Sequence, residues 1–232
     1  MNRLGFLVSQ TALVASVALG ALASSGCNTN DEPYKPAPAW TGRKPSLPAP
    51  PTVNVTIKNG DAYTIAGVIH QLHSRIHEKE VNGKELTVVG YIVESNIPSA
   101  PACAIHDVGK KDPDNCKSEL PSFWIADTKD GKPRIRVLGW AKNFATVYEA
   151  MKKYDKLKEP PKELVKDELF SADVPFPLPA VGAKVKVTGT YGFSFTKATT
   201  GVVSDPETGV LTYKKVDQLE AAPSPAAFQN KK

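Results

Sequence analysis

The chain has 232 residues, a length that allows one or two domains. Its formal net charge is +5, from 29 Lys and Arg against 24 Asp and Glu. The acidic residues are spread among the basic ones, which indicates a mixed solvated surface and excludes the polybasic clusters typical of proteins that bind nucleic acid by charge alone.

Residues 1–27 have the pattern of an export signal. A short basic start at Asn2 and Arg3 precedes an apolar run over residues 4–22, and residues 23–26 are all small. The alternative is a transmembrane helix. Polar and small residues interrupt the apolar run, however, and the small residues before Cys27 are typical of a cleavage site.

The triplet Ser25-Gly26-Cys27 resembles the lipobox of bacterial lipoproteins. The resemblance implies that residues 1–26 are a signal peptide, cut off before Cys27, and that Cys27 carries lipid. Several acyl chains on one residue anchor a protein firmly to a membrane. Asn28 is not the Asp that this family links to retention in the inner membrane. The resemblance therefore implies a lipid-anchored protein of the bacterial cell envelope, in the outer membrane and facing the periplasm.

Residues 27–52 are predicted to be a proline-rich tether. Seven prolines lie between positions 33 and 51, and the segment has no apolar periodicity. Such a segment cannot pack a core and favours an extended polyproline conformation. We expect it to hold a domain of residues 53–220 away from the membrane, with a flexible polar tail at 221–232.

The domain is predicted to begin with a short strand at 53–57 and an amphipathic helix at 61–79. Alternation at period two then predicts strands, and apolar residues at helical spacing predict a second helix. Gly90 and Gly189 each lie inside a strand, where glycine permits a sharp bend. The predicted order is strands at 85–95, 122–127 and 134–139, a helix at 143–157, and strands at 183–191 and 209–219.

This order resembles the OB-fold. The resemblance is carried by Val88-Val89-Gly90-Tyr91, Phe123-Trp124-Ile125-Ala126-Asp127, Ile135-Arg136-Val137 and Val185-Lys186-Val187-Thr188-Gly189. It implies a mainly β fold. The expected architecture is a five-stranded OB-like Greek-key barrel with a helix between strands 3 and 4 and an extra N-terminal helix.

Cys103 and Cys116 lie in the long loop that is predicted at residues 98–121. In an exported chain these two cysteines are expected to form a disulfide, because Cys27 is taken by lipid and two cysteines remain. The alternative is a metal site completed by His106 and Asp107. Zinc–thiolate sites usually have closer cysteine pairs, which favours the disulfide.

His70, His73 and His77 share one side of the predicted helix at 61–79, because residues three and four apart are neighbours on a helix. Three imidazoles can hold a metal ion. They can equally flank the buried stripe of Ile69, Leu72 and Ile76 without binding anything. No carboxylate accompanies them, and we therefore predict no metal.

A binding face is predicted on the outer side of the second and third strands. If Phe123, Ile125, Ile135 and Val137 point inward, alternation directs their neighbours outward. In OB-folds this face and its adjoining loops are the usual binding surface, and aromatic side chains beside arginines can stack bases. The alternative is that the long loop or the segment at 162–180, which contains prolines 175, 177 and 179, covers this face. The residues predicted to point outward are Trp124, Arg134, Arg136, Leu138 and Trp140.

The sequence contains no nucleophile elbow, phosphate-binding glycine loop or paired-carboxylate motif, so we expect neither an enzyme nor a cofactor. The expected function is that of a cell-envelope lipoprotein whose barrel is a non-catalytic binding or assembly module for an envelope protein or polymer. One alternative is a protein that binds single-stranded nucleic acid at the cell surface or in the periplasm. A third is a metal-dependent enzyme built on the three histidines.

Overall fold

The computed structural model describes residue 42, residues 54–196 and residues 201–230. Cys27, the predicted signal peptide and all of the predicted tether except Gly42 lie outside the described residues. Within the described part of the chain, no helix is long and apolar enough to cross a membrane.

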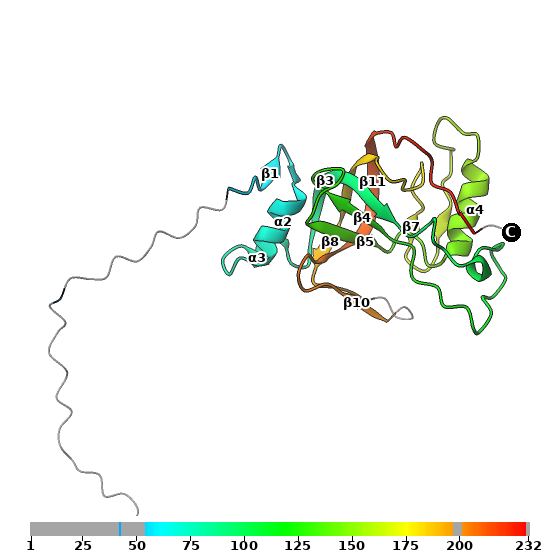
Figure 1. The fold of residues 1–232 in the computed structure, drawn as a ribbon, viewed down its shortest axis with the longest axis horizontal. Helices are drawn as coiled ribbons and strands as arrows, with labels where there is room; N and C mark the ends of the chain where they lie inside the picture. The colour runs from blue at the N-terminus through cyan, green and yellow to red at the C-terminus, as the bar shows by residue number, and fades with distance from the viewer. Residues whose placement is uncertain (1–41, 43–53, 197–200, 231–232) are drawn as a thin grey trace, which may run out of the picture. The chain divides into compact units, whose positions relative to one another are not determined.

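A mixed β-sheet is the main feature of the described residues (Figure 1). Its seven strands have the order β1-β2-β3-β4-β5-β11-β8, and β8 also pairs with β3. The pairings from β3 onward therefore form a circuit of five strands, in which only the β5–β11 pair is parallel. The prediction of a mainly β fold is confirmed. The five strands of the circuit are β3 (Lys84–Ser95), β4 (Phe123–Ala126), β5 (Arg134–Leu138), β8 (Lys184–Gly192) and β11 (Val210–Glu220).

Both glycines that were predicted to bend strands lie where another strand approaches closely. A Cβ atom at Gly189 would lie 2.1 Å from the carbonyl oxygen of Thr212, and one at Gly90 would lie 2.7 Å from that of Ala126. Real side chains do not fit at such distances. The β11 ladder also shifts register next to Thr212, between Tyr213 and Lys215. A side chain at Gly189 would therefore push β8 and β11 apart.

The predicted helix at 61–79 is wrong in its extent, because two helices with a turn between them occupy this segment: α2 (Ile65–Leu72) and α3 (Glu78–Val81). The amide of Ser74 donates to the carbonyl of Gln71, and the hydroxyl of Ser74 accepts from the amide of His77. A serine side chain that bonds the backbone in this way competes with helix continuation. Ile76, which was expected in the buried stripe, is 80% exposed.

Short strands lie before and between the main ones. The predicted strand at 53–57 is wrong for residues 54–57, because β1 begins at residue 58 and forms a hairpin with β2. A further hairpin, formed by β9 and β10, follows β8 in the sequence. It was not predicted, because each of its strands is too short to show periodicity. These short strands are β1 (Lys58–Asn59), β2 (Ala62–Tyr63), β6 (Lys166–Asp167), β7 (Ala172–Asp173), β9 (Ser194–Thr196) and β10 (Val202–Ser204).

Helix α4 (Phe144–Tyr154) lies between β5 and β8 in the sequence, as predicted, and on the opposite side of the sheet from α2 in Figure 1. The tail that follows β11 packs near α4. The ring of Phe228 lies 6.3 Å from that of Phe144, and Asn230 Nδ2 donates to the carbonyl of Ala100 over 3.1 Å. The prediction of a flexible tail at 221–232 is therefore wrong for residues 222–230. A single aromatic residue in a polar run gave no periodic signal.

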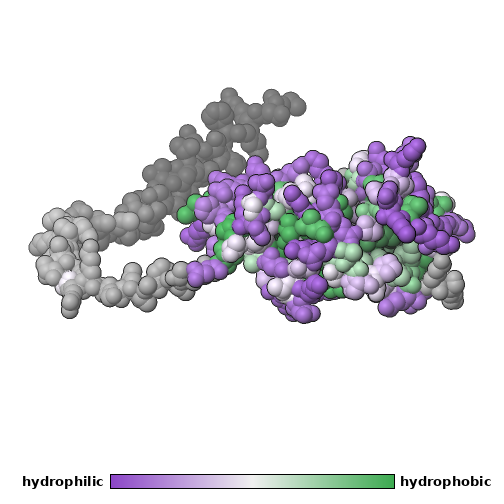
Figure 2. Space-filling view, turned by 90° about the horizontal axis from the view of Figure 1, so that it is seen from above, coloured by the Kyte–Doolittle hydropathy of each residue, from purple (hydrophilic) through white to green (hydrophobic). Residues whose placement is uncertain are grey.

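Hydrophilic residues cover most of the face of the domain seen in Figure 2, with smaller apolar patches between them. This mixed surface agrees with the interspersed charges of the sequence.

Candidate functional site

The predicted alternation on β4 and β5 is present in the structure. Phe123, Ile125, Ile135 and Val137 are fully buried. Trp124 of β4 lies opposite Arg136 of β5, and both side chains are partly exposed. The two strands therefore present a partly exposed aromatic and cationic surface on their outer side.

Two guanidinium groups contact the ring of Trp124. The Cζ atom of Arg136 is 5.0 Å from the centroid of the indole ring, and that of Arg134 is 5.7 Å away. At such distances the negative face of an aromatic ring attracts a cation, by about 0.5–1 kcal/mol at exposed sites. The three side chains therefore form one aromatic and cationic cluster.

Carboxylates partly neutralise these arginines. Arg134 forms an ion pair with Glu94 of β3, and Arg136 forms one with Glu119 of the long loop at 3.2 Å. Arg136 also donates from Nε and Nη2 to the hydroxyl of Ser122, over 3.1 and 2.9 Å. The surface thus offers donors, acceptors and an aromatic ring together, a mixture suited to a polar or planar ligand. We call Glu94, Glu119, Trp124, Arg134 and Arg136 the Trp124 patch.

Leu138 and Trp140, which were predicted to lie on this face, are fully buried, so the prediction is wrong for both. The alternation of exposed and buried residues already ends at Leu138, the last residue of β5. At Gly139 a φ of 86°, which is available mainly to glycine, then turns the chain. Trp140 then packs against Phe123 with ring centroids 6.2 Å apart. The ring of Phe195, which is 1% exposed, approaches Gly139 from β9. A residue of the unpredicted β9–β10 hairpin therefore helps to cover this end of β5.

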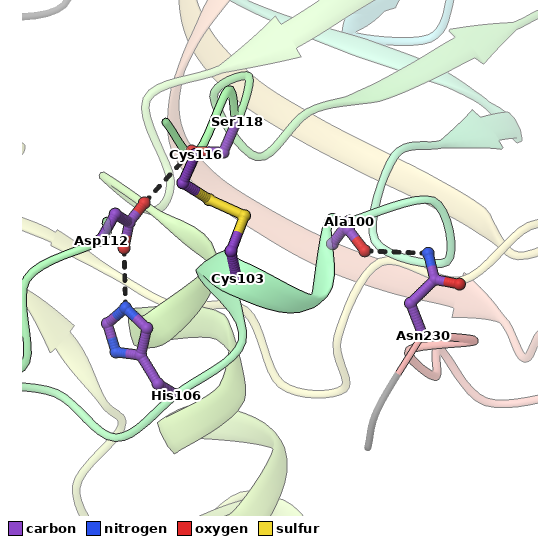
Figure 3. Close-up of a disulfide and its surroundings, with 7 residues drawn as sticks. All are labelled: Ala100, Cys103, His106, Asp112, Cys116, Ser118 and Asn230. Atoms are coloured by element: carbon purple, nitrogen blue, oxygen red, sulfur yellow. Dashed lines mark hydrogen bonds and ion pairs between the residues drawn. A yellow bond between two sulfur atoms is a disulfide. The ribbon is translucent and has the colours of Figure 1, made fainter. Parts of the chain in front are cut away.

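Cys103 and Cys116 form a disulfide across 13 positions of the loop between β3 and β4, which confirms the prediction (Figure 3). The alternative metal site is wrong, because both sulfur atoms are used in the bond. Cys103 lies in a short 3₁₀ helix, Ala102–Ala104, of which Ala104 is fully buried. The disulfide therefore ties the outer part of the loop to a segment that belongs to the core.

His106 links two parts of the same loop through hydrogen bonds. Its Nε2 donates to Asp112 at 2.7 Å, and its Nδ1 donates to the carbonyl of Asp107 at 3.0 Å. Asp112 also accepts from the hydroxyl of Ser118 (Figure 3). Only the protonated imidazole has two N–H groups. The hydrogen bond to the Asp107 carbonyl and the interaction with Asp112 accordingly raise the pKa of His106 above its ordinary value.

The three helix histidines do not converge. His73 Nε2 donates to the carbonyl of Glu207 at 2.7 Å, and His77 Nδ1 is 3.0 Å from Glu80 Oε1. His73 directly follows the last residue of α2 and His77 directly precedes α3, so no single helix aligns them with His70. Within residues 54–196 and 201–230, no group of three His, Cys, Asp or Glu side chains could hold a metal ion.

Sequence reasoning missed a cavity of about 640 Å³ beside α4. Tyr154 forms one wall, and its hydroxyl donates to the carbonyl of Val174 and accepts from the amide of Val165. Burial raises the pKa of Tyr154, so the hydroxyl remains a donor. Another wall is the segment 176–180. The prolines at 175, 177 and 179 were the only sequence signal that this part of the chain is irregular.

No family model matches the chain, and no curated protein sequence matches it. Among solved structures, the chain is similar to an OBody, AM3L09, bound to hen egg-white lysozyme, at 12% identity and a TM-score of 0.29, over 62% of this chain and 88% of that one. It is similar to a putative aspartyl-tRNA synthetase from Leishmania major Friedlin at 13% identity and a TM-score of 0.33, over 75% of this chain and 23% of that one. It is also similar to asparaginyl-tRNA synthetase from Pyrococcus horikoshii at 14% identity and a TM-score of 0.26, over 62% and 21%. The chain thus spans less than a quarter of either synthetase.

Proposed function

We propose that the chain is a cell-envelope lipoprotein, anchored through lipid on Cys27, whose barrel is a non-catalytic binding or assembly module for an envelope protein or polymer. The observation that carries the proposal is the Cys103–Cys116 disulfide in a chain that begins with a signal-like segment. Disulfides persist in oxidising compartments such as the bacterial periplasm. The lipobox-like Ser25-Gly26-Cys27 supports attachment to the outer membrane on its periplasmic side.

The module is proposed to be an OB-type Greek-key barrel. The circuit β3-β4-β5-β11-β8, with its single parallel pair and with α4 between the third and fourth strands, supports this assignment. In such barrels the face of the second and third strands, with the adjoining loops, is the usual binding surface. The Trp124 patch lies on the corresponding strands, and Glu119 joins it from the adjoining loop. Because a fold alone does not define a function, the patch carries the binding proposal.

Lipid attachment is tested by labelling cells with an azide-tagged palmitate and purifying the protein. Label on the native chain and none on Cys27→Ser are expected, with retention of residues 1–26 in the variant. Ser25→Ala is a suitable control, because alanine keeps the small side chain before the cleavage site. A native protein that carries no label and keeps residues 1–26 would refute the anchoring.

The partner is sought with a photoreactive phenylalanine derivative, p-benzoylphenylalanine, placed at position 124 in intact cells. The matched control places the same residue at Val202, which is 68% exposed on β10. We expect a discrete crosslinked product from position 124 that is absent from position 202. No product, or equal products from both positions, would contradict a binding role for the patch.

Single-stranded nucleic acid is a second candidate, favoured specifically by the Arg134–Trp124–Arg136 cluster. Base stacking on an aromatic ring contributes about 1–3 kcal/mol per base, and binding to phosphates weakens steeply with salt. Glu94 and Glu119 oppose this candidate, because they neutralise the arginines. Quenching of tryptophan fluorescence by a thymidine oligonucleotide, lost on raising salt and in Trp124→Ala, would establish it. Fluorescence that does not change would exclude it.

A further inference from the structure

The cavity beside α4 is lined mostly by apolar side chains. One wall is the end of α4, and another is the segment 176–180 with its prolines. Val216 of β11 and Val185 of β8 form the floor. The rings of Tyr154 and Phe176 meet edge to face, with centroids 5.2 Å apart, and hold the first two walls together. A volume of about 640 Å³ lies within the range of small-molecule sites, about 300–1,000 Å³.

Residues 221–227 form the remaining wall. Pro225 and Ala226 line both this cavity and a smaller neighbouring hollow of about 220 Å³, so the C-terminal segment lies between the two. The segment is fixed beyond the cavity, where the amide of Gln229 donates to the carbonyl of Pro98 over 3.3 Å. Asn230 adds its bond to Ala100, which Figure 3 shows. The C-terminal segment at 221–227 that borders the cavity is therefore held in place by hydrogen bonds at residues 229 and 230.

Charge is gathered at the end of the cavity that α4 supplies. Lys156 lines the cavity and makes no ion pair with any described residue. Its φ of 64° places it just beyond the helix, where the chain turns. Asp155 also lines this end of the cavity, so the charged lining consists of one carboxylate and one ammonium group. The cavity therefore combines a mainly apolar interior with a lysine at one end that has no ion-pair partner among the described residues.

We propose that this cavity binds a free fatty acid, with its acyl chain among the apolar walls and its carboxylate beside Lys156. An acyl chain gains free energy with each methylene that apolar walls bury, and an ammonium group favours a carboxylate over a neutral head. The cavity is separate from the Trp124 patch and shares no residue with it. The inference therefore stands or falls independently of the proposed function.

The test adds a palmitate carrying a diazirine and an alkyne to the purified full chain, so that the probe cannot be attached to Cys27 by the cell. After irradiation, the labelled peptides are identified by mass spectrometry. Crosslinks are expected in residues 151–157, 176–180 and 221–227. Labelling confined to other peptides, or spread evenly along the chain as nonspecific contact would produce, would overturn the proposal.

Two cavity-filling variants sharpen the result. Val216→Trp fills the floor, and Ala226→Phe fills the space from the C-terminal segment, where a smaller effect on the fold is expected because residue 226 is only partly buried. Either variant is expected to reduce crosslinking to the three segments at least about fivefold. Val202→Trp, which adds the same ring at an exposed site outside the cavity, is the matched control. Unchanged crosslinking in Ala226→Phe would refute the site even if Val216→Trp were unstable.

Lys156→Glu tests the orientation of the ligand. The variant is expected to lower crosslinking of the palmitate probe about tenfold and to leave that of the matching fatty alcohol unchanged, because the alcohol has no charge to lose. Lys110→Glu, a lysine of the disulfide loop that does not line this cavity, should change neither probe. An equal loss of both probes, or no loss of either, would overturn the placement of the carboxylate.

Discussion

The carboxylate of Asp127 binds the first two amides of helix α2. Its Oδ1 accepts from the amide of Ile65 at 2.7 Å, and its Oδ2 accepts from that of Ala66 at 2.8 Å. Asp127 directly follows β4, more than 60 residues further along the chain. The side-chain hydroxyl of Thr64, which directly precedes the helix, accepts from the amide of Gly67 at 2.9 Å. The amide of Thr64 itself donates to the carbonyl of Ile57 at 3.1 Å. All four amides that a helix leaves unpaired at its start are therefore bonded, and the carboxylate of Asp127 ties α2 to the sheet.

Replacing Asp127 with alanine should destabilise the domain. The variant loses two charge-assisted hydrogen bonds at a helix N-terminus, and we expect the free energy of unfolding to fall by about 1–2 kcal/mol. Urea denaturation followed by circular dichroism measures the change. Asp130→Ala, in the exposed turn after β4, is the control and should change stability by less than about 0.5 kcal/mol. Equal effects of the two variants would contradict the capping role.

A side chain at Gly189 should be tolerated much less than one at a glycine that has open space around it. Gly189→Ala would bring a methyl group against the carbonyl of Thr212, and we expect a loss of about 3 kcal/mol, high in the range for overpacking. Gly60 has no atom near its Cβ position and differs only in its φ of 63°. Gly60→Ala should therefore cost about 1 kcal/mol. A smaller loss at Gly189 than at Gly60 would disprove the close approach of β8 and β11.

Removal of the disulfide should weaken the domain without changing its secondary structure. On the chain-entropy account, a closed loop of this length contributes about 3 kcal/mol, and the double variant Cys103→Ser with Cys116→Ser should lose that amount. Thermal denaturation measures the loss. A reducing agent should lower the melting temperature of the native chain and leave that of the double variant unchanged. A native chain that is insensitive to reduction would contradict this prediction.

His106 should make the disulfide loop more stable in acid than in alkali. Its folded pKa is raised, so its contribution is fully present below its ordinary value of about 6.5 and is lost as the pH rises through the raised value. Asp112→Asn should lower the pKa of His106 in an NMR titration. A partial rise should remain, because the carbonyl of Asp107 still accepts from Nδ1. Asp114→Asn, which removes only the partner of Lys111, should leave the titration unchanged.

Most of the main strands could be predicted because each has one buried face. The period-two pattern at 85–95, 122–127 and 134–139 requires no knowledge of distant residues, and the observed strands β3, β4 and β5 differ from it by a residue or two. The prediction for the binding face extended the same pattern too far, to Leu138 and Trp140. The alternation already ends at Leu138, and the positive φ at Gly139 then turns the chain, whereas local reasoning assumes that the alternation continues.

The residues of the chain by themselves determined the succession of the main strands and helices along the chain, the two glycines inside strands and the pairing of Cys103 with Cys116, because alternation, missing side chains and cysteine number are local properties. Only the tertiary structure decided the order of the strands in the sheet, the burial of Trp140 and the bond of His73 to the distant carbonyl of Glu207. It also decided that the C-terminal segment closes a cavity beside α4. Each of these depends on segments far apart in the chain, whose contacts are set by packing and leave no periodic signal in the sequence.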